Sequence, residues 1–367
     1  MIKILFIAPL SANGGIASWA KSYIHYLNDN HYKLHPIDCS SRHRTPNDTS
    51  IFKRIFWGLY DLIPLITKIN KAFKCEKFNI MHIATSGSIG SFRDIIVGYI
   101  CKRLQCKIIL HCHYGCITDN VQNSGIIGWL TKTALKIYDQ IWVLDEKSLF
   151  FLNHIPELKN KIYLTPNPIK VAWPKDLSEK KFNTIAFIGN LIPAKGIFEL
   201  VEAVKQCGDV RLDIIGPGTP DVISTIRNIA GDNLNNRIFL HGFVHNDKAL
   251  EILKGIDIVA LPTYYPFEAF PISILEAMSL TKLVISTNRA AIPDILTLSD
   301  GSKCGIIVQE KSVDEIVKAI KFCQNFPSEA NHMCRNAYDK VKNTYAIEIV
   351  NEIYKTNYNN LINYNIK

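Results

Sequence analysis

Short apolar runs alternate with longer amphipathic stretches along most of the chain. Apolar runs bounded by glycine or proline predict buried strands, whereas an apolar period of about 3.6 residues predicts helices. The clearest example lies between Ile256 and Asp294. It predicts a strand at 256–261, a loop at 262–267, a helix from about Pro271, a second strand at 283–286, and a short loop that closes at Pro293 and Asp294. This order of elements predicts an open α/β sheet.

The same patterns predict the elements on either side of this stretch. Strands are expected at 3–9, 80–84, 107–110, 141–144, 185–189, 211–215, 238–243 and 304–308, and helices at 16–27, 312–323 and 331–361. Ser312 and Glu315 have the spacing of a capping box, in which each side chain bonds the other's backbone amide. The lysine-rich stretch 175–181 is expected to be a linker between two domains.

Two carboxylates lie inside the stretch from Ile256 to Asp294. Pro271 suits the first turn of a helix, because its missing N–H would have no partner there. Glu268 is then expected just before the helix and Glu276 on its second turn, at the strand edge where open α/β sheets bind ligands. The free amides of residues 272–274 suit a phosphate, Glu276 suits a pair of ribose hydroxyls, and Glu268 suits a sugar. A nucleoside diphosphate sugar would satisfy all three.

This segment resembles a known enzyme signature. Residues 268–278 read E-A-F-P-I-S-I-L-E-A-M, and L-V-I-S at 283–286 and I-P-D at 292–294 follow. The segment is similar to the E-x7-E motif of the family 4 glycosyltransferases, which are retaining enzymes of the GT-B fold. Two glutamates alone are often solvated helix positions, but the surrounding order of strand, loop, helix and strand favours the resemblance.

The length of 367 residues suits two domains better than one core. The resemblance implies two Rossmann-like domains that face each other across a cleft. We expect an acceptor-binding domain at 1–170, a nucleotide-sugar-binding domain at 171–345, and a C-terminal helix at 346–367 that returns to the first domain. A T-P-N-P run before residue 169 resembles the segment that ends the family's first domain, and its prolines would stiffen the crossing.

The composition, 47% hydrophobic and 20% charged, is that of a globular protein. No apolar run approaches the roughly 18 residues of a membrane span, and the first residues read as a strand that ends at Pro9, not as a signal peptide. The ten cysteines form no C-x-x-C pair, so the reducing cytosol is the expected compartment. A metal site at His111, Cys112, His113 and Cys116 is discounted, because a strand sends His111 and His113 to one face and Cys112 to the other.

The net charge of +9 belongs to the first half of the chain. Residues 1–170 hold 21 Lys and Arg against 11 Asp and Glu, whereas the remainder is nearly balanced. No nucleic-acid recognition motif accompanies this charge, so an anionic membrane face or a diphosphate-linked lipid is preferred as the partner. Residues 51–78 combine aromatic side chains, among them Phe52, with lysines and with Arg54. They predict either a helix in the membrane interface or a helix packed on the first sheet.

Three further groups in the first half are candidates for ligand contacts. Gly14 and Gly15 either let the backbone approach a ligand or form a plain tight turn, and their place resembles the family's glycine loop. The strand-end run His111-Cys-His-Tyr-Gly115 resembles an H-x-H-G segment of the family with a tyrosine inserted. The resemblance implies that His113 faces the sugar and the leaving phosphate, with His111 as a rival. Arg93 is either a phosphate or acceptor contact or a surface residue.

The second half contains the remaining donor-binding residues that the resemblance implies. Lys195 matches a family lysine that neutralises the departing diphosphate, while Asn190 stands where the family usually has an arginine. Asparagine offers only neutral donors, so Asn190 binds phosphate more weakly, another basic residue substitutes, or turnover is slow. The turn after the strand at 238–243 lines the nucleotide base in the family, so Phe243 and Val244 are expected base contacts, with a core role as the alternative. The complete expected donor site is Gly14, Gly15, Gly189, Asn190, Lys195, Gly216, Phe243, Val244, Phe270, Ser273, Ile274 and Glu276, with His113, Lys195 and Glu268 as the catalytic residues.

The expected reaction is glycosyl transfer from a nucleotide sugar with retained configuration. No two aspartates lie two residues apart, so the D-x-D metal clamp of other glycosyltransferases is missing, and no essential metal or other cofactor is expected. The donor would be a UDP- or GDP-linked hexose or N-acetylhexosamine, and the acceptor a glycan or a lipid-linked hydroxyl in bacterial O-antigen or capsule synthesis. The enzyme would lie on the cytoplasmic face of the membrane. The alternatives are a nucleotide-sugar epimerase of the same fold and a non-catalytic nucleotide-binding scaffold.

Overall fold

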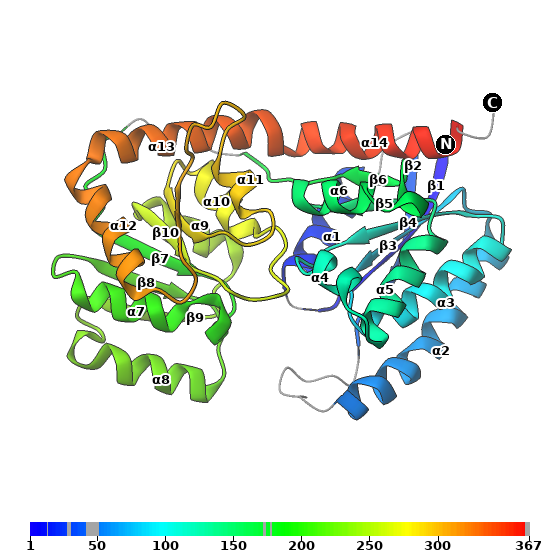
Figure 1. Cartoon of the computed structure of the whole chain (residues 1–367), viewed down its shortest axis with the longest axis horizontal. Coiled ribbons are helices and arrows are strands. Elements are labelled where there is room, and N and C mark those ends of the chain that lie inside the picture. Colours follow the sequence, from blue (N-terminus) through cyan, green and yellow to red (C-terminus); the bar gives the residue numbers. More distant parts are fainter. Residues whose placement is uncertain (13, 28–30, 42–50, 172–173, 177, 364–367) are drawn as a thin grey trace. The chain divides into compact units, whose positions relative to one another are not determined.

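The computed structural model describes residues 1–12, 14–27, 31–41, 51–171, 174–176 and 178–363, without the side chains of residues 51–55 and 246. These residues form two compact units (Figure 1). The first unit contains residues 1–168 and 348–367, and the second contains residues 169–347. The last helix therefore belongs to the first unit, although it follows the second in sequence.

The first unit is built on a parallel sheet of six described strands in the order β2-β1-β3-β4-β5-β6. The strands are β1 (Ile2–Ala8), β2 (Tyr32–Asp38), β3 (Ile80–Thr85), β4 (Lys107–Cys112), β5 (Gln140–Val143) and β6 (Ile162–Leu164). The helices are α1 (Gly15–Leu27), α2 (Ile51–Cys75), α3 (Gly90–Arg103), α4 (Ile117–Gln122), α5 (Ile126–Ile137), α6 (Glu146–Asn153), the short η1 (Pro156–Leu158) and α14 (Ile347–Asn363).

The two faces of the first sheet differ in chemistry because side chains alternate along each strand. One face carries aliphatic residues such as Ile83 and Leu110, which pack against helices α2, α3, α5 and α6. The other face carries aromatic and histidine side chains, and it is covered by α1 and α14 (Figure 1). Trp142 of β5 stacks on Tyr354 of α14 with their ring centroids 5.3 Å apart, which anchors the last helix to this unit.

The second unit also has six described parallel strands, in the order β12-β11-β10-β7-β8-β9. The strands are β7 (Thr184–Ile188), β8 (Arg211–Ile215), β9 (Ile238–Gly242), β10 (Ile258–Leu261), β11 (Leu283–Thr287) and β12 (Ile306–Val308). The helices are α7 (Ile197–Gln206), α8 (Pro220–Ala230), α9 (Asn246–Lys254), α10 (Ile272–Ser279), α11 (Ile292–Leu296), α12 (Val313–Asn325) and α13 (Pro327–Lys340), with short turns η2 (Pro193–Lys195), η3 (Gly231–Asn233) and η4 (Val341–Tyr345).

The strand orders locate the expected ligand edges. In an open α/β sheet the ligand binds outside the carboxyl ends of the strands, where the chain reverses its direction of winding. This point lies between β1 and β3 in the first sheet and between β7 and β10 in the second. The loops after these strands are therefore the first places to look for a site.

Several local elements differ from the predictions. Strand β2 was not predicted. Pro293 and Asp294 lie in helix α11 and not in a closing loop. The helix expected at 331–361 is broken at Ala346, between η4 and α14.

The described residues of the stretch 175–181 do not form a linker, because they pack on the second unit. The amide of Asp176 donates to Thr281 Oγ1 at 3.0 Å, and Lys175 pairs with Asp339 at 2.5 Å. The boundary between the units instead falls at Pro168, inside the proline-flanked run before residue 169. The Ser312 hydroxyl does accept the Glu315 amide at 3.2 Å, as the capping-box pattern predicts.

Candidate functional site

The centre of the candidate site is an ion pair at the point in the second sheet where the winding reverses. Lys195 ends the turn η2 after β7, and Glu268 lies in the loop between β10 and α10. The Lys195 Nζ and Glu268 Oε2 atoms are 3.2 Å apart, close enough for an ion pair although they are not aligned as a hydrogen bond. Both side chains are largely buried, with 17% and 11% of their surfaces exposed. Two predicted catalytic residues that are far apart in sequence thus meet.

The loops that carry this pair are joined by backbone hydrogen bonds. The Tyr264 amide donates to the Ala194 carbonyl at 2.8 Å, which ties the loop after β10 to η2. The hydroxyl of Thr287, at the end of β11, donates to the Thr263 carbonyl in the same loop. The ends of β7, β10 and β11 therefore form one connected surface.

Three glycines continue this surface across the ends of β7, β8 and β9. The Gly189 amide donates a hydrogen bond to the Ile215 carbonyl at 3.0 Å, and the Gly216 amide donates one to the Gly242 carbonyl at 2.8 Å. A Cβ atom on Gly216 would lie 1.9 Å from the Gly189 carbonyl oxygen, so no larger residue fits. A Cβ atom on Gly189 would lie 3.7 Å from Lys195 Nζ, which puts the ammonium directly beside this glycine. The predicted Gly189 thus adjoins the ion pair, and the predicted Gly216 packs against Gly189.

The start of helix α10 differs in one respect from the prediction. Pro271 caps the helix in an extended conformation. The Ile274 amide donates to the Pro271 carbonyl at 3.1 Å, so this amide is not free for a phosphate, and the expectation of three free amides was wrong for Ile274. The Ile274 side chain is fully buried, while Ser273 and Glu276 are partly exposed.

The other predicted donor contacts have contrasting environments. Phe270 is buried, and its ring packs edge-on against Tyr345 at 5.4 Å between centroids. Phe243 is 68% exposed, which excludes the alternative core role for this side chain. Val244 is half-buried and Asn190 is exposed.

A cation that the sequence analysis missed lies on the same edge. Arg289 follows β11, and its guanidinium pairs with Glu310 after β12 at 2.7 Å. No local motif marks this arginine, since its relevance depends on strand order alone.

The glycine loop of the first unit is held by an acid that the sequence analysis also missed. Asp38, at the end of β2, accepts hydrogen bonds from the Leu10 amide at 2.9 Å and the Ser11 hydroxyl at 2.5 Å. Burial alone would raise the pKa of Asp38, but hydrogen bonds from Ser11 and Ser40 outweigh it and lower the pKa to about 2. A Cβ atom on Gly14 or Gly15 would meet no atom within 4 Å, so open space adjoins the loop.

The two rival histidines of β4 are distinguished by their hydrogen bonds. His111 is fully buried, and its ring nitrogens bond His82 at 3.2 Å and Thr165 at 3.4 Å. His113 is 6% exposed, and its Nε2 atom is buried without a hydrogen-bond partner among the described residues. The geometry therefore favours His113 over His111 as the residue with a free ring nitrogen.

His113 is also uncharged at neutral pH. Burial lowers the pKa of His113 to about 3. The inserted Tyr114 is buried and packs on Gly87, where a Cβ atom would lie 2.5 Å from the tyrosine ring. This insertion therefore fills the core and leaves the side chains of His111 and His113 on one face, with their ring centroids 4.1 Å apart.

Arg93 is partly buried and forms an ion pair with its neighbour in the same helix. Its guanidinium pairs with the buried Asp94 at 2.7 Å, and Asp94 in turn accepts the Thr85 hydroxyl at 2.5 Å. Arg93 therefore stabilises the start of α3. In the part of the chain that the structure describes, no group of three or more His, Cys, Asp or Glu side chains could hold a metal ion.

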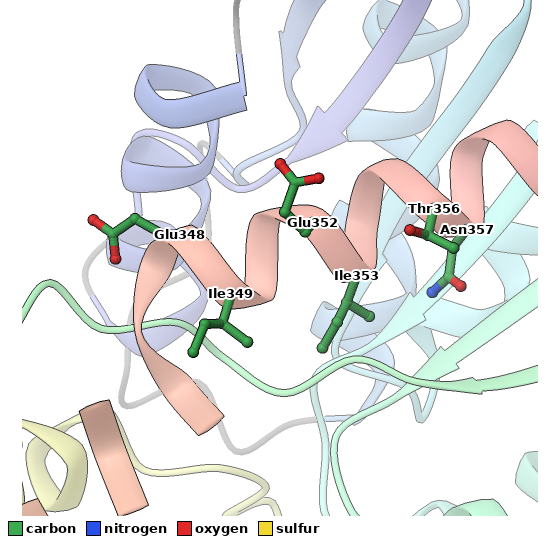
Figure 2. A pocket seen from close by; sticks show the side chains of 6 residues that line it. All are labelled: Glu348, Ile349, Glu352, Ile353, Thr356 and Asn357. Carbon is green, nitrogen blue, oxygen red and sulfur yellow. The ribbon is translucent and has the colours of Figure 1, made fainter. Parts of the chain in front are cut away.

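A shallow hollow follows the exposed side of α14 (Figure 2). Side chains of this one helix line it: Glu348, Ile349, Glu352, Ile353, Thr356 and Asn357. None of the predicted site residues borders it, so it is separate from the candidate site.

Comparison with known proteins agrees with this geometry. Residues 171–340, nearly all of the second unit, match the family model described as glycosyl transferases group 1. Residues 171–340 are therefore similar to a glycosyltransferase group 1 domain. The domain contains Lys195, Glu268, Glu276 and the glycines beside them.

Similar sequences carry glycosyltransferase names. An uncharacterized glycosyltransferase of Methanocaldococcus jannaschii is 28% identical over 155 residues, which are 41% of this chain and 38% of that protein. The glycosyltransferase WcaL of Escherichia coli, named for colanic acid biosynthesis, is 23% identical over 51% of this chain and 46% of its own length. The chain thus aligns with less than half of the length of these two relatives.

Solved structures match nearly the whole chain. Sucrose-phosphate synthase from Thermosynechococcus elongatus has a TM-score of 0.76 at 14% identity, over 98% of this chain and 99% of its own. HepE from Anabaena in complex with UDP-glucose has a TM-score of 0.70 at 14% identity, with 97% and 99% covered. The lipopolysaccharide outer core galactosyltransferase WaaB has a TM-score of 0.67 at 15% identity, with 99% and 100% covered. The predicted GT-B fold, with two parallel α/β sheets, is confirmed.

Proposed function

We propose that the protein is a retaining glycosyltransferase that moves a hexose or an N-acetylhexosamine from a UDP- or GDP-sugar to an acceptor hydroxyl. One observation carries this proposal: Lys195 and Glu268 meet beside Gly189 in the second unit, where the winding of the sheet reverses. A cation beside exposed backbone suits a diphosphate, and a carboxylate at the same point suits a sugar.

The reaction would proceed by front-side displacement. The bond between the sugar's anomeric carbon and the phosphate oxygen breaks, and the acceptor oxygen forms a new bond on the same face. The departing diphosphate accepts the proton of the acceptor hydroxyl. Lys195 stabilises the negative charge that develops on the leaving oxygen. Glu268 orients the sugar, and Glu276 accepts hydrogen bonds from the ribose hydroxyls.

In the first unit, His113 is proposed as a hydrogen-bonding residue for a sugar. Because burial holds its pKa near 3, His113 is neutral and its Nε2 atom can form a hydrogen bond but supplies no charge. Gly14 and Gly15 border open space and suit a close approach of the acceptor or of the donor phosphates.

The acceptor would be a glycan or a lipid-linked hydroxyl in bacterial surface polysaccharide synthesis, on the cytoplasmic face of the membrane. Helix α2 divides into two parts that support this choice. Its second half packs on the sheet through Leu65 and Ile69, whereas its first half exposes Phe56 and Ile63 by 60% and 69%. Apolar side chains at one end of a basic helix suit an interface with anionic lipid. Phe52 and Arg54 lie outside the described side chains, and no described helix has the length and hydrophobicity to cross a membrane.

One assay separates the proposal from its alternatives. The protein is incubated with radiolabelled UDP- and GDP-sugars, with and without a bacterial membrane lipid extract. UDP-glucose is the first probe because HepE, which shares the fold, was crystallised with it. Label in the lipid or glycan fraction that depends on added acceptor supports transfer. Interconversion of the free donor would instead support an epimerase, and binding without chemistry a scaffold.

Glu276→Ala provides the matched test of donor binding. Loss of the bonds to two ribose hydroxyls should weaken donor binding by about 100-fold. The control is Glu251→Ala, on the exposed side of α9, which should bind the donor as the wild type does. Unchanged donor affinity in Glu276→Ala would count against the assignment.

A further inference from the structure

The donor proposed above needs more positive charge than Lys195 supplies. A nucleoside diphosphate carries at least two negative charges at neutral pH, whereas Lys195 carries a single positive charge. Asn190 is exposed and neutral. A second cation is therefore expected on the same edge of the second sheet.

Arg289 is a cation at the carboxyl edge of the second sheet. It follows β11, which is separated from β7 only by β10. Adjacent strands lie about 4.8 Å apart, so the ends of β7 and β11 are about 10 Å apart, within the combined reach of a lysine and an arginine side chain.

The backbone of Arg289 is fixed against the loop that carries Glu268. The Arg289 amide donates to Thr287 at 2.9 Å, and the Ile292 amide donates to the Arg289 carbonyl at 2.9 Å. The Ala291 amide donates to the Ala269 carbonyl at 3.1 Å, and Ala269 directly follows Glu268. This turn therefore keeps a constant position relative to the ion pair of Lys195 and Glu268.

The guanidinium is only partly satisfied. One terminal nitrogen pairs with Glu310 Oε1 at 2.7 Å, while the buried Nε atom has no hydrogen-bond partner among the described residues. The Arg289 side chain is 26% exposed, and Glu310 is 35% exposed. A buried N–H without a partner is costly, and an incoming oxygen ligand would satisfy it.

We propose that Arg289 is a donor-binding residue whose guanidinium binds the diphosphate, and that Glu310 holds the guanidinium in position when the site is empty. This inference rests on the proposed function. Arginine suits the role because its planar fork can bond two phosphate oxygens at once and stays charged. The arginine after β11 thus supplies the charge that Asn190 does not.

The test is calorimetric titration of the full-length protein with UDP and GDP, and with uridine and guanosine, for the wild type and three variants. Arg289→Gln should bind the diphosphate about 10- to 100-fold more weakly and the nucleoside as well as the wild type does. Glu310→Gln removes the same ion pair but keeps the arginine, so it should bind the diphosphate at least as tightly as the wild type. Arg211→Gln is the matched control, because Arg211 pairs with Asp213 at 2.8 Å at the opposite, amino-terminal edge of the sheet.

The outcomes separate the inference from the function beneath it. Diphosphate affinity that is unchanged in Arg289→Gln, or weakened equally in Glu310→Gln, would overturn the role of Arg289 while the proposed function stands. Failure of the wild type to bind any nucleoside diphosphate or nucleotide sugar would overturn both. If Arg289→Gln does not fold, Arg289→Lys keeps one charge without the fork and should still bind about tenfold more weakly.

Discussion

The two sheets of this protein have nearly the same architecture but different chemistry at their ligand edges. In the second unit the edge carries the ion pair of Lys195 and Glu268 and a partly satisfied arginine. It also carries a glycine ladder, formed by Gly189, Gly216 and Gly242 at the ends of neighbouring strands. In the first unit the corresponding histidines are buried among aromatic rings, and burial lowers the pKa values of His82, His111 and His113. The second edge is charged, whereas the histidine cluster of the first unit is neutral.

This difference indicates a division of tasks. A diphosphate needs cations and exposed amides, which the second edge offers. A sugar or an acceptor hydroxyl carries no charge, so neutral hydrogen-bonding groups beside apolar surface can also bind it, and His113 and the rings around it offer such groups. Fold similarity would not reveal this division, because both units share the parallel sheet.

The largest expected effect comes from removing the charge at the second edge. Lys195→Ala should lower kcat by about 100- to 1,000-fold, because the leaving diphosphate loses its nearest cation. Lys205→Ala is the control, because Lys205 forms a surface pair with Glu202 on helix α7 and should leave kcat unchanged. Steady-state kinetics with the donor found in the transfer assay checks this, and equal kcat values for the two variants would refute the division.

The next largest effect concerns the glycine ladder. Gly216→Ala should lower the free energy of unfolding by about 2–4 kcal/mol, because its Cβ atom would overlap the Gly189 carbonyl and its φ of 142° is strained for alanine. Gly208→Ala, where a Cβ atom meets nothing within 4 Å, should change stability by less than about 1 kcal/mol. Thermal unfolding of both variants and of the wild type measures the two stability changes. A neutral Gly216→Ala would mean that the ladder tolerates side chains.

A smaller effect should appear in the first unit as pH falls. His82, His111 and His113 have folded pKa values below their unfolded value near 6.5, so their stabilising effect is complete above that pH and decreases as pH drops below it. Each histidine should lower the free energy of unfolding by up to about 1.4 kcal/mol for each pH unit below pH 6.5. Fluorescence of Trp19 and Trp142, which lie in this cluster, should report unfolding at a lower urea concentration at pH 5.5 than at pH 7.5. An identical midpoint at both pH values would show that the histidines are not buried neutral.

The smallest effect is expected at Asp38. Its folded pKa of about 2 lies below the unfolded value near 3.9, so its stabilising effect is present above pH 4 and is lost as pH falls toward 2. Because Asp38 is partly exposed, Asp38→Asn should cost only about 1 kcal/mol at pH 7. The free energy of unfolding of the variant should also change less between pH 4 and pH 2 than that of the wild type. Acid titration of both proteins would check this. A variant that loses stability between pH 4 and pH 2 as steeply as the wild type would contradict the bonds of Asp38 to Ser11 and Ser40.

The sequence predicted what local patterns encode. The strand, loop and helix around Glu268 were expected because an apolar run, a proline and an amphipathic period lie next to each other. Strand β2 was missed because it is an edge strand whose exposed positions include Pro36, so its apolar run is interrupted. Asp38 is the last residue of that strand, so it was missed as well.

Contacts between distant parts of the sequence could not be predicted in the same way. The bond between His82 and His111 joins two strands, and no spacing rule relates them. The approach of Arg289 to the donor edge depends on the order of β7, β10 and β11, which the sequence does not state. Lys195 was named only because the resemblance to a family gave it a role, whereas Glu268 was also expected from its place at the edge of the strands.

We propose that the charged edge of the second unit binds the diphosphate and that the histidine cluster of the first unit does not. The most direct test is calorimetric titration of UDP and GDP into the wild type, Lys195→Ala and His113→Gln. We expect Lys195→Ala to lose about 10- to 100-fold in affinity for whichever diphosphate the wild type binds, and His113→Gln to bind it as the wild type does. Equal affinity in Lys195→Ala, or a comparable loss in His113→Gln, would contradict it.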